Sequence, residues 1–125
     1  MPKNILIIDD DQNVLKLISR LVEDLGHTPI CVENGTQAIR YLISDKADLA
    51  IVDILLPGIC GVELMFRFKE LRLPIIVVSG LDKEEVLNRV SKELGIVDFI
   101  KKPFTMQEFQ KSIETVKDPI KRGFQ

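Results

Sequence analysis

Three consecutive aspartates, Asp9, Asp10 and Asp11, directly follow the apolar run of residues 5–8. Carboxylates held this close together raise one another's pKa unless a cation lies between them. Mg²⁺ suits such a cluster, because it prefers oxygen ligands and usually takes only one or two protein carboxylates. Aspartate is also common in turns and at the start of helices, so the run by itself leaves a turn or a helix cap open.

Three more residues with reactive or charged side chains follow other apolar runs: Asp53, Ser79 and Lys102. Together with the aspartates they suit the handling of a phosphoryl group. The Asp53 carboxylate is ionised at neutral pH, so it can attack phosphorus and form an acyl phosphate without a general base. Lys102 can contact one phosphoryl oxygen as a compact positive charge, and Ser79 can donate a hydrogen bond to another.

The same interpretation assigns the ligands of a metal ion. Asp10 and Asp53 are expected to hold Mg²⁺, and Asp9 to reach it through a water molecule. A backbone carbonyl at Leu55 completes the protein's share of the ligands. The metal would screen the repulsion between an attacking carboxylate and an anionic phosphoryl donor, and would neutralise charge during transfer.

The elements that must position these residues alternate between strand and helix patterns. Apolar runs predict strands at residues 4–8, 29–32, 48–52, 75–78 and 97–101. Helical spacing predicts helices at residues 12–25, 36–44 and 62–71, a fourth between a capping pattern at Asp82 and Gly95, and a fifth after a capping pattern at Thr105. The second helix is expected to bury one face formed by Ala38, Ile39, Leu42 and Ile43.

Five strands that alternate with five helices predict an α/β fold with a parallel sheet covered on both faces. Residues 5–8, 49–52 and 75–78 are apolar without a break, as is typical of central parallel strands. The second strand begins at Pro29 and the fifth carries charged residues, which places both at the edges. The predicted fold is the flavodoxin-like (βα)5 doubly wound sheet with strand order 2-1-3-4-5. Such sheets bind ligands beyond the carboxyl ends of the strands, between the first and the third.

Composition limits the classes of function. The chain has 125 residues, and we expect one domain over residues 1–118 and a short basic tail at residues 119–125. Its net charge of −2, with both signs interspersed, argues against a nucleic-acid or membrane surface. No apolar run approaches the about 20 residues of a membrane span, and no signal peptide pattern occurs. Two cysteines are too few for a disulfide scaffold or a zinc site, so a cytoplasmic protein with free thiols is expected.

The residues at the strand ends resemble the receiver domain of bacterial two-component response regulators, and the resemblance spans about residues 4–117. The matching segments are Asp9-Asp10, residues 52–58, Gly61, residues 78–80 and residues 102–104. The resemblance implies that a sensor histidine kinase or a phosphotransfer protein phosphorylates Asp53. It also implies a cis peptide bond between Lys102 and Pro103, which is a proline feature.

The resemblance further implies a switch formed by Ser79 and Phe99. Ser79 is expected to move toward the phosphate and Phe99 to turn inward, which changes the surface of the fourth helix, fifth strand and fifth helix. Leu55 and Leu81 stand where the family tunes acyl-phosphate lifetime, and two leucines cannot orient water, so slow self-dephosphorylation is expected. The chain would then be a phosphoacceptor that assists its own modification, not an enzyme with external substrates.

Two features depart from the family pattern. Cys60 stands where the family often has aspartate, and the pair at residues 96–97 replaces a usual small residue after Gly95. Neither departure touches the inferred chemistry.

Three other functions compete with that of a phosphorylated receiver. A flavin-binding electron carrier needs a phosphate cradle after its first strand, where this chain has three repelling carboxylates. A metal-dependent phosphatase with an aspartyl nucleophile would carry the nucleophile after the first strand, whereas the candidate nucleophile here follows the third. It would also need a cap domain to exclude water, for which this chain has no room. Receiver-like interaction modules that are not phosphorylated usually lack one of the key residues, whereas this chain keeps them all.

The sequence does not show how the chain passes on a signal. It leaves open whether the chain acts on a downstream protein target or on a C-terminal effector domain. It also leaves open whether the chain is a stand-alone regulator or a piece of a longer protein. Phosphorylation-dependent pairing of two copies also stays open.

Overall fold

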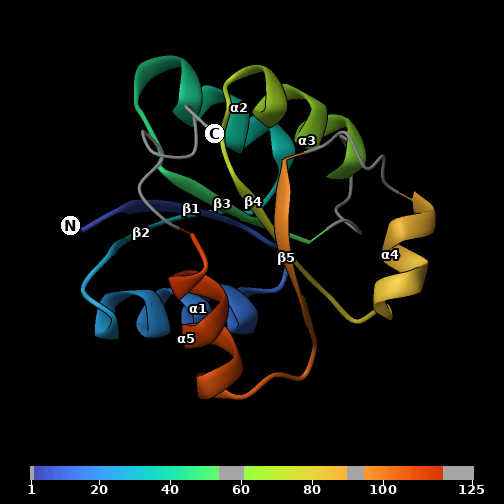
Figure 1. The fold of residues 1–125 in the computed structure, drawn as a ribbon. Helices are drawn as coiled ribbons and strands as arrows, with labels where there is room; N and C mark the ends of the chain where they lie inside the picture. Colours follow the sequence, from blue (N-terminus) through green and yellow to red (C-terminus); the bar gives the residue numbers. More distant parts are fainter. Residues whose placement is uncertain (1, 54–60, 90–94, 117–125) are drawn as a thin grey trace.

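The computed structural model describes residues 2–53, 61–89 and 95–116, and its five parallel strands form one sheet in the order β2-β1-β3-β4-β5 (Figure 1). The strands are β1 (Asn4–Ile8), β2 (Thr28–Val32), β3 (Leu49–Val52), β4 (Ile75–Ser79) and β5 (Ile96–Lys101). The helices are α1 (Gln12–Asp24), α2 (Gly35–Ser44), α3 (Gly61–Glu70), α4 (Lys83–Arg89) and α5 (Met106–Glu114). The predicted flavodoxin-like (βα)5 architecture and its strand order are confirmed.

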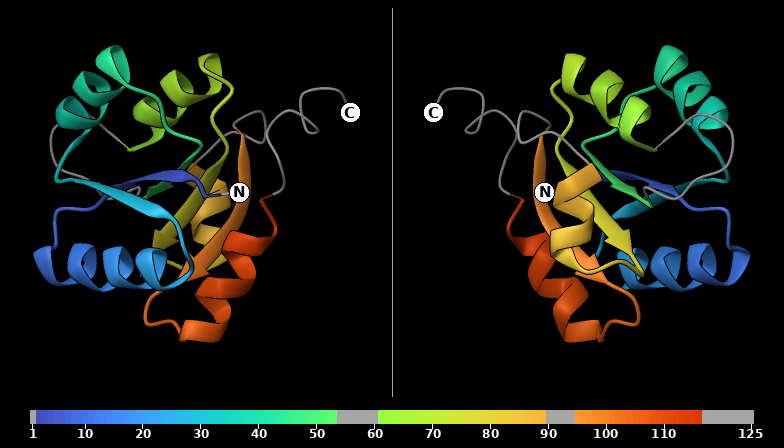
Figure 2. Two further views of the ribbon diagram at one scale, coloured as in Figure 1. Left: turned by 90° about the vertical axis from the view of Figure 1, so that its left-hand side faces the viewer. Right: turned by 90° about the vertical axis from the view of Figure 1, so that its right-hand side faces the viewer.

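Helices cover both faces of the sheet (Figure 2). Side chains of β1 alternate between the faces, as strand geometry requires. Ile5 and Ile7 pack in one core with residues of α1 and α5, and Leu6 and Ile8 pack in the other with residues of α2, α3 and α4. All four side chains are at most 1% exposed. Burial on both faces explains why the central strands are apolar without a break.

The two edge strands are those that the sequence predicts. β2 pairs only with β1, and β5 pairs only with β4, among the strands that the structure describes. The pairing of β4 with β5 contains an irregularity that the sequence does not predict, because Ile75 lies opposite Ile96 while Ile76 lies opposite Asp98. This shift places Lys101 opposite Ser79, at the carboxyl end of the sheet.

Local capping fixes where several helices begin. The Asp11 side chain accepts hydrogen bonds from the backbone N–H groups of Asn13 and Val14 and so caps α1. Asn34 caps α2, which the sequence interpretation missed, although asparagine is a good capping residue. Thr105 forms the predicted capping box of α5 with Glu108.

One predicted core position is wrong. Ile43 is 80% exposed, whereas Ala38 is fully buried and Leu42 is half-buried. At 100° per residue, Ile43 lies about 140° around the helix from Ala38, which is too far to share its buried face. The predicted end of the fourth helix beyond residue 89 and the predicted tail at residues 119–125 lie outside the described residues.

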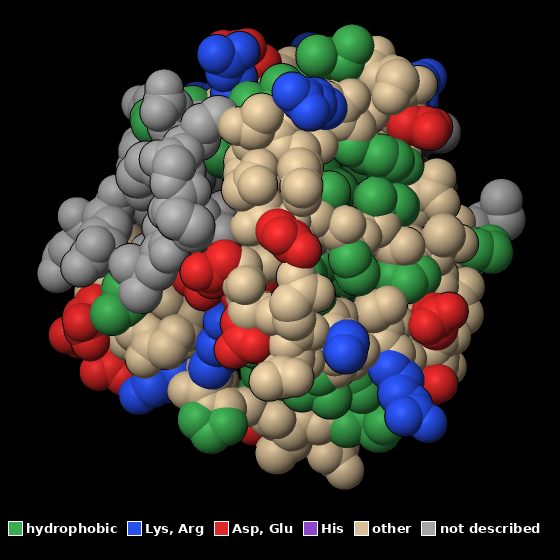
Figure 3. All heavy atoms as spheres, turned by 180° about the vertical axis from the view of Figure 1, so that it is seen from behind, with side chains coloured by type: hydrophobic (Ala, Val, Ile, Leu, Met, Phe, Trp, Pro, Cys, Tyr) green, Lys and Arg blue, Asp and Glu red, His purple; other side chains and the backbone are tan. Residues whose placement is uncertain are grey.

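Charged side chains of both signs are mixed on one face of the molecule (Figure 3). Figure 3, which shows the face opposite to that of Figure 1, has acidic and basic side chains interspersed with small hydrophobic groups. No helix within residues 2–53, 61–89 and 95–116 combines the length and the apolar character that a membrane crossing needs.

His27 joins the start of β2 to the segment before β1. Its Nδ1 atom accepts a hydrogen bond from the backbone N–H of Lys3 at 3.0 Å. Burial lowers the pKa of His27 from its usual 6.5, and the positive charge of Lys3 lowers it further. The Lys3 ammonium also donates a hydrogen bond of 2.7 Å to the carbonyl of Val116, just after α5.

We predict that His27 makes the free energy of unfolding depend on pH. Because its pKa is lower in the folded chain than in the unfolded chain, its contribution is complete above about pH 6.5 and is lost as the pH falls through the lowered folded-state value. Chemical denaturation of wild type and His27→Gln from about pH 8 to about pH 5 measures this. The stability advantage of wild type should shrink on acidification; parallel curves would contradict the prediction.

Candidate functional site

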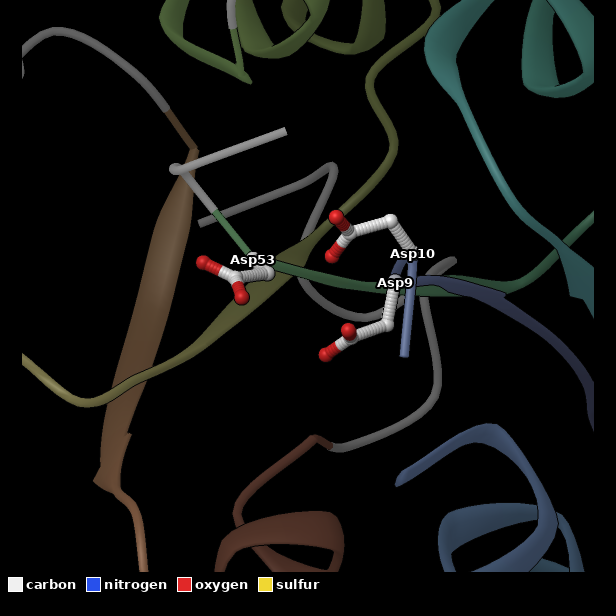
Figure 4. A group of neighbouring side chains, drawn as sticks. All are labelled: Asp9, Asp10 and Asp53. Atoms are coloured by element: carbon white, nitrogen blue, oxygen red, sulfur yellow. The ribbon is translucent and has the colours of Figure 1, made fainter. Parts of the chain in front are cut away.

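Three carboxylates meet at the carboxyl ends of β1 and β3 (Figure 4). Asp9 and Asp10 follow β1, and Asp53 follows β3, its neighbour in the sheet. One carboxylate oxygen from each residue lies within 4.8 Å of the others. Asp9 is 2% exposed and Asp53 is 9% exposed, while Asp10 is exposed to solvent. The structure therefore brings together the three aspartates that the sequence assigns to a metal site.

Lys102 supplies positive charge to the two buried carboxylates. Its Nζ atom donates hydrogen bonds to Asp9 Oδ2 at 2.8 Å and to Asp53 Oδ2 at 3.1 Å. Burial by itself would lower the pKa of Lys102, but the hydrogen bonds and negative charges of the two aspartates outweigh burial and raise this pKa above its usual value. Lys102 is therefore charged at neutral pH and partly balances the cluster.

The backbone around Lys102 fixes its place beside the carboxylates. Lys102 directly follows β5, and its N–H donates a hydrogen bond of 2.8 Å to the carbonyl of Ser79 at the end of β4. The peptide bond between Lys102 and Pro103 is cis, as the sequence resemblance implies. The hydrogen bond to Ser79 places Lys102, 93 positions from Asp9 in the sequence, at the same end of the sheet.

The three consecutive aspartates have three different structural tasks. Asp9 is buried, and its Oδ1 accepts a hydrogen bond of 2.9 Å from the backbone N–H of Asp11. Asp11 caps α1 with its own side chain, so the helix-cap alternative is confirmed for this residue. Asp10 turns its carboxylate toward Asp53 (Figure 4), within the group that could hold a cation.

Ser79 and Phe99 lie on neighbouring strands, β4 and β5. Ser79 is 1% exposed, and its Oγ accepts a hydrogen bond of 3.2 Å from the backbone N–H of Leu81. Phe99 lies opposite Val77 and is half-buried. Both residues line a hollow of about 90 Å³, which we call the Ser79–Phe99 hollow. Its lining consists of Val77, Ser79, Leu81, Lys83, Val86, Phe99, Ile100 and Lys101.

Two features of this region were missing from the sequence interpretation. The Lys83 ammonium lies 5.5 Å from the centroid of the Phe99 ring. The Lys101 side chain forms an exposed ion pair with Asp82. The only sequence feature that could have indicated the contact between Lys83 and Phe99 is a lysine shortly after the strand that carries Ser79. The last predicted site residue, Leu55, lies outside the described residues.

The chain matches the family model of the response regulator receiver domain over residues 5–114. Among curated proteins it is similar to the alkaline phosphatase synthesis transcriptional regulatory protein PhoP of Bacillus subtilis, with 30% identity over 93% of this chain and 49% of that protein. It is also similar to the sporulation initiation phosphotransferase F of Bacillus subtilis, with 27% identity over 91% of this chain and 93% of that protein.

Solved structures share the fold over nearly the whole chain. A CheY-like response regulator receiver domain protein from Methanospirillum hungatei has a TM-score of 0.86 and 26% identity, covering 98% of this chain and 99% of that one. The response regulator TrrA from Thermotoga maritima, in complex with Mg²⁺ and BeF, has a TM-score of 0.81 and 26% identity, covering 92% of this chain and 99% of that one.

The fold and the site define a doubly wound α/β protein with an acidic site where the sheet order reverses, between β1 and β3. The match over residues 5–114 then places the chain in a family: it belongs to the response regulator receiver domains. The chain spans about half the length of PhoP and of the response regulator GtcR from Aneurinibacillus migulanus.

We predict that Lys102 stabilises the fold through the buried carboxylates. In Lys102→Met, without divalent cations and at neutral pH, the free energy of unfolding should fall by about 1–3 kcal/mol, because Asp9 and Asp53 lose a charged hydrogen-bond partner. Denaturant unfolding measures the loss. Lys101→Met removes only an exposed ion pair and should change stability far less. Equal losses in the two variants would contradict the prediction.

Proposed function

We propose that the chain is a phosphoacceptor receiver, in which Asp53 takes a phosphoryl group from a sensor histidine kinase or a phosphotransfer protein. The observation that carries this proposal is the convergence of Asp53 with Asp9, Asp10 and the Lys102 ammonium at one end of the sheet. Family membership supports it, since the four residues that meet here all belong to segments that resemble the receiver family.

The proposed chemistry is a direct transfer of a phosphoryl group from the donor to the Asp53 carboxylate. A carboxylate oxygen of Asp53 forms a bond to phosphorus while the bond from phosphorus to the donor's leaving group breaks, giving an aspartyl phosphate. The nucleophile is already ionised, so no proton has to be removed from it. Lys102, which is charged and 3.1 Å from Asp53 Oδ2, is placed to contact an oxygen of the incoming group.

The donor set fits Mg²⁺. Three carboxylate oxygens within 4.8 Å of one another are hard ligands, and the exposed position of Asp10 leaves room for water molecules, which Mg²⁺ retains. We propose that Asp10 and Asp53 would hold the ion directly, Asp9 through water, and the carbonyl of Leu55 as a further ligand. When bound, Mg²⁺ supplies charge neutralisation at the transferring phosphoryl group. The Mg²⁺ in the TrrA complex supports the choice of this ion.

Phosphorylation is proposed to change the surface formed by α4, β5 and α5. Ser79 would turn its hydroxyl toward the phosphate, and Phe99 would turn into the Ser79–Phe99 hollow, which both residues line. Such a step biases an existing equilibrium between two conformations. Moving that equilibrium from 1:99 to 99:1 requires about 5.5 kcal/mol of differential interaction, which a few charge-assisted hydrogen bonds and metal coordination can supply.

The phosphorylated state is proposed to be long-lived and to act through other proteins. Leu81 lines the Ser79–Phe99 hollow and has no polar group to orient water, which fits slow self-dephosphorylation. In this proposal the chain is a cytoplasmic signalling protein, not an enzyme with external substrates. Its output would be a downstream protein or a C-terminal effector domain, and the name of PhoP as a transcriptional regulatory protein supports the second route.

The alternative is a receiver-like interaction module that is not phosphorylated. It would not need the three carboxylates and the lysine together, and like charges packed at this distance are costly without a function. The geometry therefore favours the phosphoacceptor.

We predict that the wild-type chain, incubated with Mg²⁺ and a small acyl phosphate, gains the mass of one phosphoryl group. Asp53→Asn should gain no phosphoryl mass, because the asparagine amide, unlike a carboxylate, does not attack phosphorus. Intact-protein mass spectrometry measures both, and the decay of the modified peak measures the lifetime. Equal mass gain in the two proteins would exclude Asp53 as the acceptor; no gain in wild type would favour the interaction module.

We also predict that Mg²⁺ stabilises the fold through Asp10. At a Mg²⁺ concentration about ten times the dissociation constant, the free energy of unfolding of wild type should rise by about 1.4 kcal/mol. Asp10→Asn should lose most of this gain. Asp11→Asn is the matched control, because it removes the same charge from the same run while asparagine still caps α1. Loss of the gain in Asp11→Asn as well would show a general charge effect and not a site.

A further inference from the structure

Lys83 makes an unusual contact for a side chain in the first turn of an exposed helix. Its ammonium lies 5.5 Å from the centroid of the Phe99 ring, on the neighbouring strand β5. A cation at this distance over an aromatic face is attracted by the negative charge of the π-system. Lys83 is exposed, so its ammonium keeps most of its water while it contacts the ring.

The same short segment also contacts the other member of the proposed switch. Leu81, two positions before Lys83, donates its backbone N–H to Ser79 Oγ at 3.2 Å. Residues 81–83 therefore contact both proposed switch residues. The backbone of Leu81 contacts Ser79, and the side chain of Lys83 contacts Phe99. Lys83 and Leu81 both line the Ser79–Phe99 hollow, as do Ser79 and Phe99 themselves.

We propose that Lys83 is a positioning residue that holds the Phe99 ring in its half-buried place and so opposes the inward turn. This inference rests on the proposed function, in which Phe99 turns inward when Asp53 is phosphorylated. A ring that moves into the hollow leaves the ammonium, or the ammonium must follow it among apolar side chains and lose water. Either course costs free energy, because an ammonium is costly to remove from water.

The expected size of the effect follows from the strength of the contact. Cation–π contacts at exposed sites shift an equilibrium about twofold to fivefold. When the competent conformation is the minor one, the apparent affinity of any ligand that selects it changes by the same factor. Loss of the Lys83 contact should therefore strengthen binding of a phosphoryl analogue at Asp53.

The test is a beryllofluoride titration in Mg²⁺, followed by NMR of the backbone amides. Lys83→Met should reach half-saturation at a concentration about two to five times lower than wild type. Lys83→Arg keeps a cation over the ring and should bind as wild type does. Lys101→Met is the matched control, since it removes a positive charge from the same region and breaks a different contact between the β4–α4 segment and β5. It should not lower the half-saturating concentration.

The sign of the shift separates positioning from simple electrostatics. A positive charge that only attracts the anionic ligand would, when removed, raise the half-saturating concentration. In a Phe99→Leu background, Lys83→Met should have no effect, because the two residues act as a pair.

An unchanged or raised half-saturating concentration in Lys83→Met overturns the inference, as does an equal decrease in the Phe99→Leu background. These results differ from a failure of the proposed function, in which wild-type protein would neither bind beryllofluoride nor gain phosphoryl mass.

Discussion

Repulsion among carboxylates at one end of a parallel sheet is the constraint on which the rest of this structure depends. Parallel pairing brings the ends of β1 and β3 together, so Asp9, Asp10 and Asp53 lie within 4.8 Å of one another. Lys102 contacts two of them, which leaves a net negative charge at the site. The site therefore favours a divalent cation, because an added positive charge relieves the remaining repulsion.

The same end of the sheet links this charge to the surface. The backbone N–H of Lys102 is hydrogen-bonded to the carbonyl of Ser79, whose hydroxyl is held by Leu81 at the start of the segment that leads to α4. Beyond Leu81, Lys83 contacts Phe99 on β5. A short chain of contacts therefore connects the charged groups around Asp53 with α4 and β5.

Much of the fold and the site could be predicted from local sequence. Uninterrupted apolar runs such as residues 5–8 predicted buried strands, and the polar residues that directly follow them predicted where the site lies. The contacts that depend on side-chain direction could not be predicted in this way. Ile43 was assigned to the buried face although it lies about 140° around the helix from Ala38. The contact of Lys83 with Phe99 joins α4 to β5 and has no local sequence pattern.

A crystal structure of the chain with Mg²⁺ and beryllofluoride, whose fluorides stand in for phosphoryl oxygens, would show directly whether the acidic cluster holds a metal and a phosphoryl group. We predict beryllium bonded to a carboxylate oxygen of Asp53, a fluoride within hydrogen-bond distance of Lys102, and Mg²⁺ in contact with Asp10 and Asp53. Beryllofluoride or Mg²⁺ bound away from these residues, with Lys102 still paired with both Asp9 and Asp53, would contradict this prediction.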